Sequence, residues 1–356
     1  MEIEMQNLLN SKNVVVGFDG FVDTIVHAVD KRNGEKFSRI QTISDFGNRI
    51  LSAAGKSSNI EIVPQKTLIG GNGPILANAL CNFGVNVKYI GTLGNCSNNI
   101  FEDFAKKTSA VSIGDYSETC AIEFSDGKIL LGQMPSMVNS DIKSILSKIP
   151  EDQLIDIFDK SDVIAMVNWT MMLNMTSIVE FFLQKIFPKF SKNEKIFFFD
   201  LADTEKRERS ELLQFLKIIS ECEKYGKSIL GLNLREAQQA LRALGNNFEI
   251  TESKESLTEA VDMIRDAMSI STVFIHGIKL SVASNDEKTS VVSGHFVKNP
   301  KISTGAGDHY NAGFLAAYLC NYDLDKVTNF AAAASAFYVK NAISPKIEDI
   351  GKVIAR

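Results

Sequence analysis

The sequence lacks most features that mark secreted, membrane-spanning or zinc-binding proteins. Only 5 of its 356 residues are cysteine, and this odd number without a CxxC pair argues against a disulfide framework and a zinc site. No apolar run approaches the ~20 residues of a membrane helix, and the start of the chain has no basic segment followed by an apolar one. We therefore expect a cytoplasmic protein that enters no membrane.

Blocks of one charge sign are also absent. The formal net charge is −5 and acids alternate with bases, which disfavours nucleic acid and anionic membrane surfaces as partners. Apolar residues make up 45% of the chain, enough for the core of one large domain. Because no repeat or long linker divides the sequence, we predict a single domain over residues 1–356.

The 4 histidines show no HxxxH spacing, and the chain contains no GxSxG elbow, which disfavours zinc hydrolysis and hydrolase triads. His309 alone lies beside a candidate site residue, Asp308. We interpret His309 as a residue on the surface of a helix.

Short β-rich runs alternate with helical patterns along most of the chain. This alternation predicts an α/β fold with a mostly parallel sheet covered by helices on both faces. The predicted strands are residues 14–16, 87–90, 163–167, 196–199, 228–231 and 272–275, and the predicted helices are residues 74–83, 100–107, 234–244 and 257–268.

One region departs from the alternation. Residues 120–124 and 128–132 are strand-like and are joined by Ser125-Asp126-Gly127, a hairpin signal, while residues 22–26 and 31–36 could supply matching strands. We predict a small β lid inserted from about residues 20–45 and 115–135. Such a lid has unpaired edges, so we expect a homodimer joined through the lids, with Ile122 and Phe124 on the apolar face.

A run of small residues, 303–313, precedes the apolar helical segment 314–319. The backbone N–H groups of Gly305 to Gly307 would be helix-terminal donors able to bind an anion, and glycine permits close approach. Asp308 adds a carboxylate at the same point. A glycine-rich turn in which Asp308 caps the helix is the alternative explanation.

Two further clusters follow predicted strands. Asp19 and Asp23 come after the first strand, where ligands of open α/β sheets bind, and could contact a polyol or serve as turn residues. Gly70-Gly71-Asn72-Gly73 precedes the helix 74–83 but does not match GxGxxG, so a turn without a ligand remains an alternative.

Asn233 and Glu236 are three residues apart after the strand 228–231. On one helical face, an amide and a carboxylate at this spacing could orient water on Mg²⁺. A helix cap explains the same pair equally well.

Taken in order, these motifs resemble those of the ribokinase-like (PfkB) carbohydrate kinase family over nearly the whole chain. The resemblance implies a three-layer α/β sandwich, a β lid over the sugar, and transfer of the γ-phosphate of ATP, with Mg²⁺, to a hydroxyl of a sugar, sugar phosphate or nucleoside. It implies Asp308 as general base and Gly305, Ala306 and Gly307 as the anion hole. It also implies substrate contacts at Asp19, Asp23, Gly70, Gly71 and Asn72, nucleotide contacts at Asn233, Glu236, Gly277 and Thr304, and Mg²⁺ held through water by Asn233 and Glu236.

The chain departs from the family pattern at three positions. Ile75 stands where the family has a sugar-binding Asn, Ile302 where it often has a cation-binding Asp, and Leu280 where a second nucleotide-site Gly is common. We therefore expect little activation by K⁺, and no residue placed from sequence discriminates one sugar from another. An ADP-dependent sugar kinase, suggested by Gly17-Phe18-Asp19, and a non-catalytic binding homologue are the alternatives.

Overall fold

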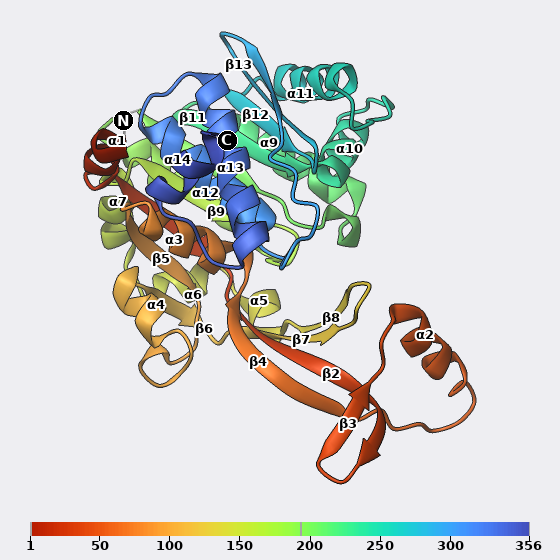
Figure 1. Cartoon of the computed structure of the whole chain (residues 1–356). Coiled ribbons are helices and arrows are strands. Elements are labelled where there is room, and N and C mark those ends of the chain that lie inside the picture. The colour runs from red at the N-terminus through yellow and green to blue at the C-terminus, as the bar shows by residue number, and fades with distance from the viewer. Residues whose placement is uncertain (1, 193, 356) are drawn as a thin grey trace.

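The computed structural model of the chain describes residues 2–192 and 194–355, and these form a large sheet between two layers of helices (Figure 1). The order of the large sheet is β14-β13-β12-β11-β10-β9-β1-β5-β6, with every neighbouring pair from β12 to β6 parallel. Its strands are β1 (Asn13–Phe18), β5 (Asn86–Thr92), β6 (Val111–Gly114), β9 (Val163–Val167), β10 (Lys195–Asp200), β11 (Gly226–Asn233), β12 (Thr272–His276), β13 (Leu280–Asn285) and β14 (Thr289–Ser293). Only β13 and β14, which were not predicted, run antiparallel at one edge.

Both faces of the sheet are buried, which explains the nearly continuous apolar strands. Along β10, Phe197 and Phe199 belong to one hydrophobic core, whereas Phe198 belongs to the other. The helices on the Phe198 side are α1 (Glu2–Leu9), α3 (Asn72–Asn82), α4 (Glu102–Lys107), α12 (Ala306–Leu319), α13 (Leu324–Asn341) and α14 (Ile347–Ile354). Those on the other side are α5 (Pro135–Asn139), α6 (Ile142–Leu146), α7 (Glu151–Asp159), α8 (Met175–Phe181), α9 (Arg209–Cys222), α10 (Leu234–Ala243) and α11 (Lys254–Met268). The predicted α/β class is thereby confirmed.

A second sheet projects from the main body (Figure 1). It contains β2 (Phe21–Asn33), β3 (Lys36–Arg39), β4 (Ile62–Gly70), β7 (Ser117–Glu123) and β8 (Lys128–Gln133), in the order β3-β2-β7-β8 with β4 also paired to β2. The predicted hairpin is confirmed as β7 and β8, and Ile122 and Phe124 are buried in a small separate core. Sequence reasoning missed β4 and the helix α2 (Ile43–Leu51) at the far end. The function of this sheet as a lid stays a prediction.

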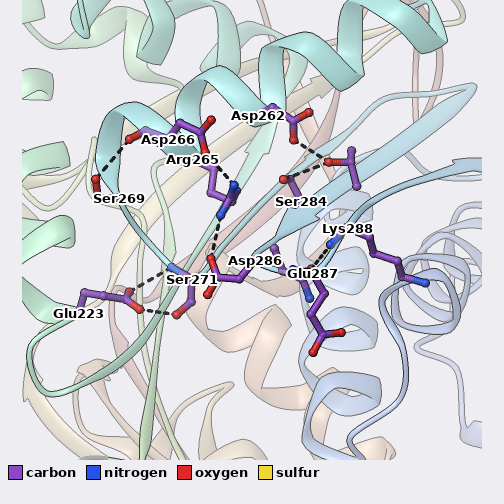
Figure 2. A network of polar contacts seen from close by, with 12 residues as sticks. Glu223, Asp262, Arg265, Asp266, Ser269, Ser271, Ser284, Asp286, Glu287 and Lys288 are labelled. Carbon is purple, nitrogen blue, oxygen red and sulfur yellow. Dashed lines mark hydrogen bonds and ion pairs between the residues drawn. The ribbon is translucent and has the colours of Figure 1, made fainter.

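A polar network lies at the amino end of β12 (Figure 2). Arg265 donates to Asp286 at 2.9 Å and to Asp266 at 2.7 Å, and Glu223 accepts from the backbone N–H groups of Ser271 and Ser228. The acids that pair with Arg265 are largely exposed to solvent. Within the described ranges, no helix is long and apolar enough to cross a membrane.

Candidate active site

The carboxyl ends of the parallel strands bring polar side chains to one edge of the large sheet. Asp19 directly follows β1, Asn168 directly follows β9, and Asp200, Asn233 and His276 are the last residues of β10, β11 and β12. Ligands of open α/β sheets bind at this edge because the strand ends and the following loops meet there. The edge therefore defines the candidate active site.

The helix α12 begins at this edge. Its first residues follow Gly305, whose φ of 87° lies in the left-handed region that glycine adopts most easily. The Ala306 N–H donates to the Ser303 carbonyl at 3.1 Å, so an anion would compete with that bond, and the contribution of this amide to the anion hole stays a prediction. Among the described residues, no hydrogen bond engages the N–H groups of Gly305, Gly307 and Asp308, which remain available to an anion.

Two cavities flank the start of α12. The smaller has a volume of about 270 Å³ and is lined by Thr304, Gly305 and Asp308 on the α12 side. The larger has a volume of about 590 Å³ and includes Ala306 and Gly307 in its lining. A group could therefore pass between ligands in the two cavities beside the free amides of the helix.

Asp308 lies on the smaller cavity with its carboxylate held in place. The Asn72 side chain donates to Asp308 Oδ1 at 3.0 Å. Burial raises the pKa of Asp308 well above its usual value, and the nearby negative charge of Asp200 adds to this rise. A carboxylate with a raised pKa, oriented toward a cavity, has the properties of a general base.

Asp19 is hydrogen-bonded to two residues that line the smaller cavity, Asn72 and Asn168. Its carboxylate accepts from the backbone N–H groups of Asn72 and Gly73 at 2.9 Å each, and from Asn168 Nδ2 at 2.6 Å. Burial raises the pKa of Asp19 to about 6, although the hydrogen bond from Asn168 opposes this rise. Asp19 is fully buried and absent from the cavity lining, and its direct contact with the substrate stays a prediction.

Asn233 and Glu236 form the start of α10. The Asn233 side chain accepts from the Glu236 N–H at 3.0 Å, and the Glu236 carboxylate accepts from the Asn233 N–H at 2.8 Å, a reciprocal cap. Asn233 lines the larger cavity, whereas Glu236 lies buried behind it. Burial and then the negative charge of Asp200 raise the pKa of Glu236 well above its usual value.

These oxygen ligands fit a Mg²⁺ ion that keeps its water shell. In the described part of the chain, no three acidic, histidine or cysteine side chains are close enough to hold a metal directly. However, Asp200 and Glu236 are both buried, and the negative charge of Asp200 raises the pKa of Glu236. No cation is among the causes of either pKa shift. Such a field attracts a hydrated divalent cation.

The remaining predicted residues divide between the two cavities. Asp23, Gly71 and Asn72 line the smaller one, and Gly277 lines the larger one. Gly70 does not line either cavity, and a Cβ at that position would overlap the Asp23 carboxylate.

Thr304 was predicted to contact the nucleotide, but the structure places it on the smaller cavity with Asp308. Ile75 also lines that cavity and gives it an apolar wall.

His309 is buried, so its interpretation as a helix-surface residue is wrong. Its ring stacks on Tyr338 with 3.6 Å between ring centroids, and Nδ1 lies 2.7 Å from the Gly305 carbonyl oxygen. A carbonyl oxygen only accepts, so Nδ1 carries the proton and Nε2 faces the Ser344 hydroxyl at 2.6 Å. Burial lowers the pKa of His309 to about 4, and the neutral ring braces the turn that begins α12.

Sequence reasoning missed Asp200, Asn168 and Lys206. Asp200 accepts from the Asn311 side chain at 2.7 Å, and its negative charge raises the pKa of Asp308 more than that of any other acid does. Asn168 and Lys206 line the smaller cavity. Asp200 and Asn168 directly follow predicted strands. The expectation that ligands bind at the carboxyl ends of parallel strands, which pointed to Asp19, could therefore have indicated both residues.

Comparisons with known proteins show which family the chain resembles. A family model described as prokaryotic ketohexokinase matches residues 2–356. A ketohexokinase of Haloferax volcanii is 22% identical over 340 residues, which are 95% of this chain and 89% of that protein. A nucleoside kinase of Methanocaldococcus jannaschii is 34% identical over 116 residues, 32% of this chain and 33% of that protein.

Solved structures share the fold. A crystal structure of the Methanocaldococcus jannaschii nucleoside kinase, described as an archaeal member of the ribokinase family, aligns with a TM-score of 0.65 at 17% identity, over 97% of this chain and 98% of that one. An Arabidopsis thaliana ribokinase complexed with ribose and ATP aligns with a TM-score of 0.64 at 18% identity, over 97% and 99% of the two chains.

Proposed function

The chain belongs to the prokaryotic ketohexokinase family, and from this premise we propose that it transfers the γ-phosphoryl group of ATP to a hydroxyl of a ketohexose. The resemblance to ribokinase-like carbohydrate kinases is confirmed, as is the assignment as a kinase of small molecules. One observation carries the proposal: backbone amides that lack a partner among the described residues lie at the start of α12 between the two cavities, with Gly305 and Asp308 lining the smaller one and Gly307 the larger one. Phosphoryl transfer needs this arrangement of acceptor, anion site and donor.

The smaller cavity suits a neutral sugar better than a sugar phosphate. Its charged lining residues are Asp23, Asp308 and Lys206. Lys206 lies 3.4 Å from Asp203, which partly neutralises it, so two carboxylates would face an anionic substrate. A nucleoside is the second candidate, supported by relatives that match about a third of the chain.

In the proposed mechanism, Asp308 takes the proton of the attacking hydroxyl while the hydrogen bond from Asn72 holds the carboxylate in place. The amides of Gly305, Gly307 and Asp308 stabilise the charge on the transferring phosphoryl group. Mg²⁺, held through water near Asn233 and Glu236, would neutralise the phosphates when bound. Because the donor phosphates would approach α12 from the larger cavity, Asn233 and Gly277 are proposed to contact the nucleotide.

The second sheet is proposed to close over the sugar and to join two subunits in the cytoplasm. Leu130 of β8 lines the smaller cavity yet is 55% exposed, and its neighbour Leu131 is 53% exposed. An exposed apolar edge strand is a site for pairing with a second copy. Light scattering at several concentrations tests this: a dimer is expected, and a monomer throughout would contradict it.

Measurement of ADP or AMP formation with a panel of acceptors tests the proposed function. The panel contains a ketohexose, an aldohexose, a pentose, a nucleoside and a hexose phosphate, each offered with ATP and with ADP. We expect the ketohexose with ATP to give the highest kcat/KM by at least about tenfold. A higher value for the nucleoside or the hexose phosphate, or for ADP as donor, would overturn the proposal.

A further inference from the structure

The peptide groups that begin α12 are held on the side of their carbonyls. In a planar trans peptide, the carbonyl and the N–H of the next residue point in opposite directions, so a hydrogen bond to the carbonyl fixes the direction of the N–H. The Ala306 carbonyl and the Gly307 N–H belong to one such peptide, and the Gly305 carbonyl and the Ala306 N–H belong to the one before it. The groups that bind these two carbonyls therefore decide where the Gly307 N–H points.

Ser335 of α13 binds the first of the two carbonyls. Its hydroxyl donates to the Ala306 carbonyl oxygen at 2.9 Å. The Gly307 N–H on the other side of that peptide has no partner among the described residues, and Gly307 lines the larger cavity. A hydrogen bond to the carbonyl also polarises the peptide and makes its N–H a stronger donor. Ser335 thus orients and strengthens a donor that faces the proposed nucleotide cavity.

His309 binds the second carbonyl. Its Nδ1–H donates to the Gly305 carbonyl oxygen at 2.7 Å, and its backbone N–H donates to the same oxygen at 3.1 Å. The Ser344 hydroxyl, 2.6 Å from Nε2, donates to that nitrogen and keeps the proton on Nδ1. The ring stacks on Tyr338 and lines neither cavity, so His309 can influence a bound ligand only through the backbone.

We propose that Ser335 and His309 are positioning residues for phosphoryl transfer, which hold the carbonyls of the first two peptides of α12 and so direct the Gly307 N–H at the phosphates of the donor. This inference rests on the proposed function. Both residues depend on the C-terminal part of the chain, because Ser335 itself and the Tyr338 and Ser344 contacts of His309 all lie in or after α13.

Two substitutions of His309 separate positioning from packing. His309→Phe keeps a ring against Tyr338 and removes the donor, whereas His309→Asn removes the ring and keeps a side-chain N–H for the Gly305 carbonyl. We expect kcat/KM for ATP to fall by about tenfold or more in His309→Phe and to stay within about threefold of wild type in His309→Asn, with little change in KM for the acceptor. A residue that serves only packing gives the opposite order, which would overturn the inference.

The same comparison applies to Ser335. Ser335→Ala removes the hydroxyl and should lower kcat/KM for ATP by about tenfold, whereas Ser335→Thr keeps a hydroxyl and should retain most of the activity. Equal activity of Ser335→Ala and wild type would overturn the role of Ser335. The melting temperature of each variant shows whether the protein is folded under the conditions of the assay.

Calorimetric titration with ATP and with AMP requires no acceptor, so it decides the inference even if no ketohexose reacts. His309→Phe and Ser335→Ala should weaken the binding of ATP by about tenfold and that of AMP by less than about twofold, because AMP lacks the phosphates near Gly307. Equal losses with both nucleotides would indicate a general disturbance of the cavity and overturn the inference. If ATP binds as expected but no ketohexose is phosphorylated, the proposed acceptor is wrong and the roles of His309 and Ser335 stand.

Discussion

The carboxyl and amino ends of the parallel strands carry opposite arrangements of charge. At the carboxyl end, Asp200, Glu236 and Asp308 are buried with raised pKa values, and among the described residues their hydrogen-bond partners are amides and backbone N–H groups. At the amino end, Asp266 and Asp286 pair with Arg265 at the surface (Figure 2). The same residue types are therefore neutralised by a cation at one end and left uncompensated at the other.

This difference separates stability from function. Exposed ion pairs contribute little to the free energy of unfolding, because water can solvate either charge when its partner is removed. Buried carboxylates without a cation destabilise the fold above their pKa values, and proteins retain them where a proton or a metal-bound phosphate must be handled. Substitutions that remove one negative charge at each end show whether that charge affects activity or stability.

The largest effect is expected for Asp308→Asn at the carboxyl end. Loss of a general base should lower kcat by about 10²–10⁴-fold, while KM for ATP changes little because the anion site is backbone. Steady-state kinetics with the best acceptor measures both constants. A kcat within about threefold of wild type would contradict the role of Asp308 as base.

The same variant should not be less stable. The folded pKa of Asp308 is raised above its unfolded value, so its ionised form destabilises the fold increasingly as pH rises from about 4 through the folded pKa. The neutral amide of the variant avoids this penalty at a pH above the folded pKa. Thermal unfolding at pH 8 should therefore give a Tm equal to or above that of the wild type.

Asp200→Asn tests the electrostatic coupling at this end. Asp308 works as a base only when ionised, so its raised pKa sets the pH below which activity falls. Removal of the Asp200 charge lowers the pKa of Asp308, and the acid limb of the kcat/KM profile should move down by about 1 pH unit. Asp286→Asn, the matched control at the amino end, is 79% exposed at its side chain and should shift the limb by less than about 0.1 unit.

Exchange of Na⁺ for K⁺ should change kcat by less than about twofold. Ile302 supplies no side-chain oxygen where related kinases often place a carboxylate, and hard cations need several oxygen ligands. The buried carboxylates at the carboxyl end would then attract a divalent cation and no monovalent one. A severalfold activation by K⁺ would show that other oxygens form the monovalent site.

The smallest effect is expected for Arg265→Met at the amino end. Asp266 and Asp286 return to water, and the buried, unpaired Arg265 Nε is removed with the guanidinium. We expect kcat/KM to stay unchanged and the free energy of unfolding to fall by no more than about 1 kcal/mol. Urea unfolding measures the change, and a loss above about 3 kcal/mol would show that this network is not a surface feature.

The sequence predicted the parallel strands and the Asp308 turn because both have local signals: apolar runs and a small-residue helix start. It could not place Thr304 on the correct cavity, since the direction of a side chain in an irregular loop depends on tertiary contacts. His309 was misjudged for a similar reason. Its burial comes from Tyr338 and Ser344 of a distant segment, which no local pattern contains.

Asn168 shows a different limit. Its position after a predicted strand was visible, but the sequence could not show that Oδ1 lacks a partner among the described residues once Asp19 accepts from the amide nitrogen. Such a deficit exists only in three dimensions. Placement at a strand end is therefore predictable, whereas unsatisfied hydrogen bonding is not.

The length of the strand β2 would make it a lever for any rotation of the projecting sheet. It begins at Phe21 beside the smaller cavity and runs to Asn33 in the projecting sheet, with register shifts against its neighbours at residues 25–26 and 29–31 (Figure 1). At about 3.3 Å per residue it is roughly 40 Å long, so a rotation of about 10° at its base would carry its far end through roughly 7 Å. A fluorescent or spin label near Asn33 would thus amplify a movement of a fraction of an ångström at the cavity into a displacement that is easily measured.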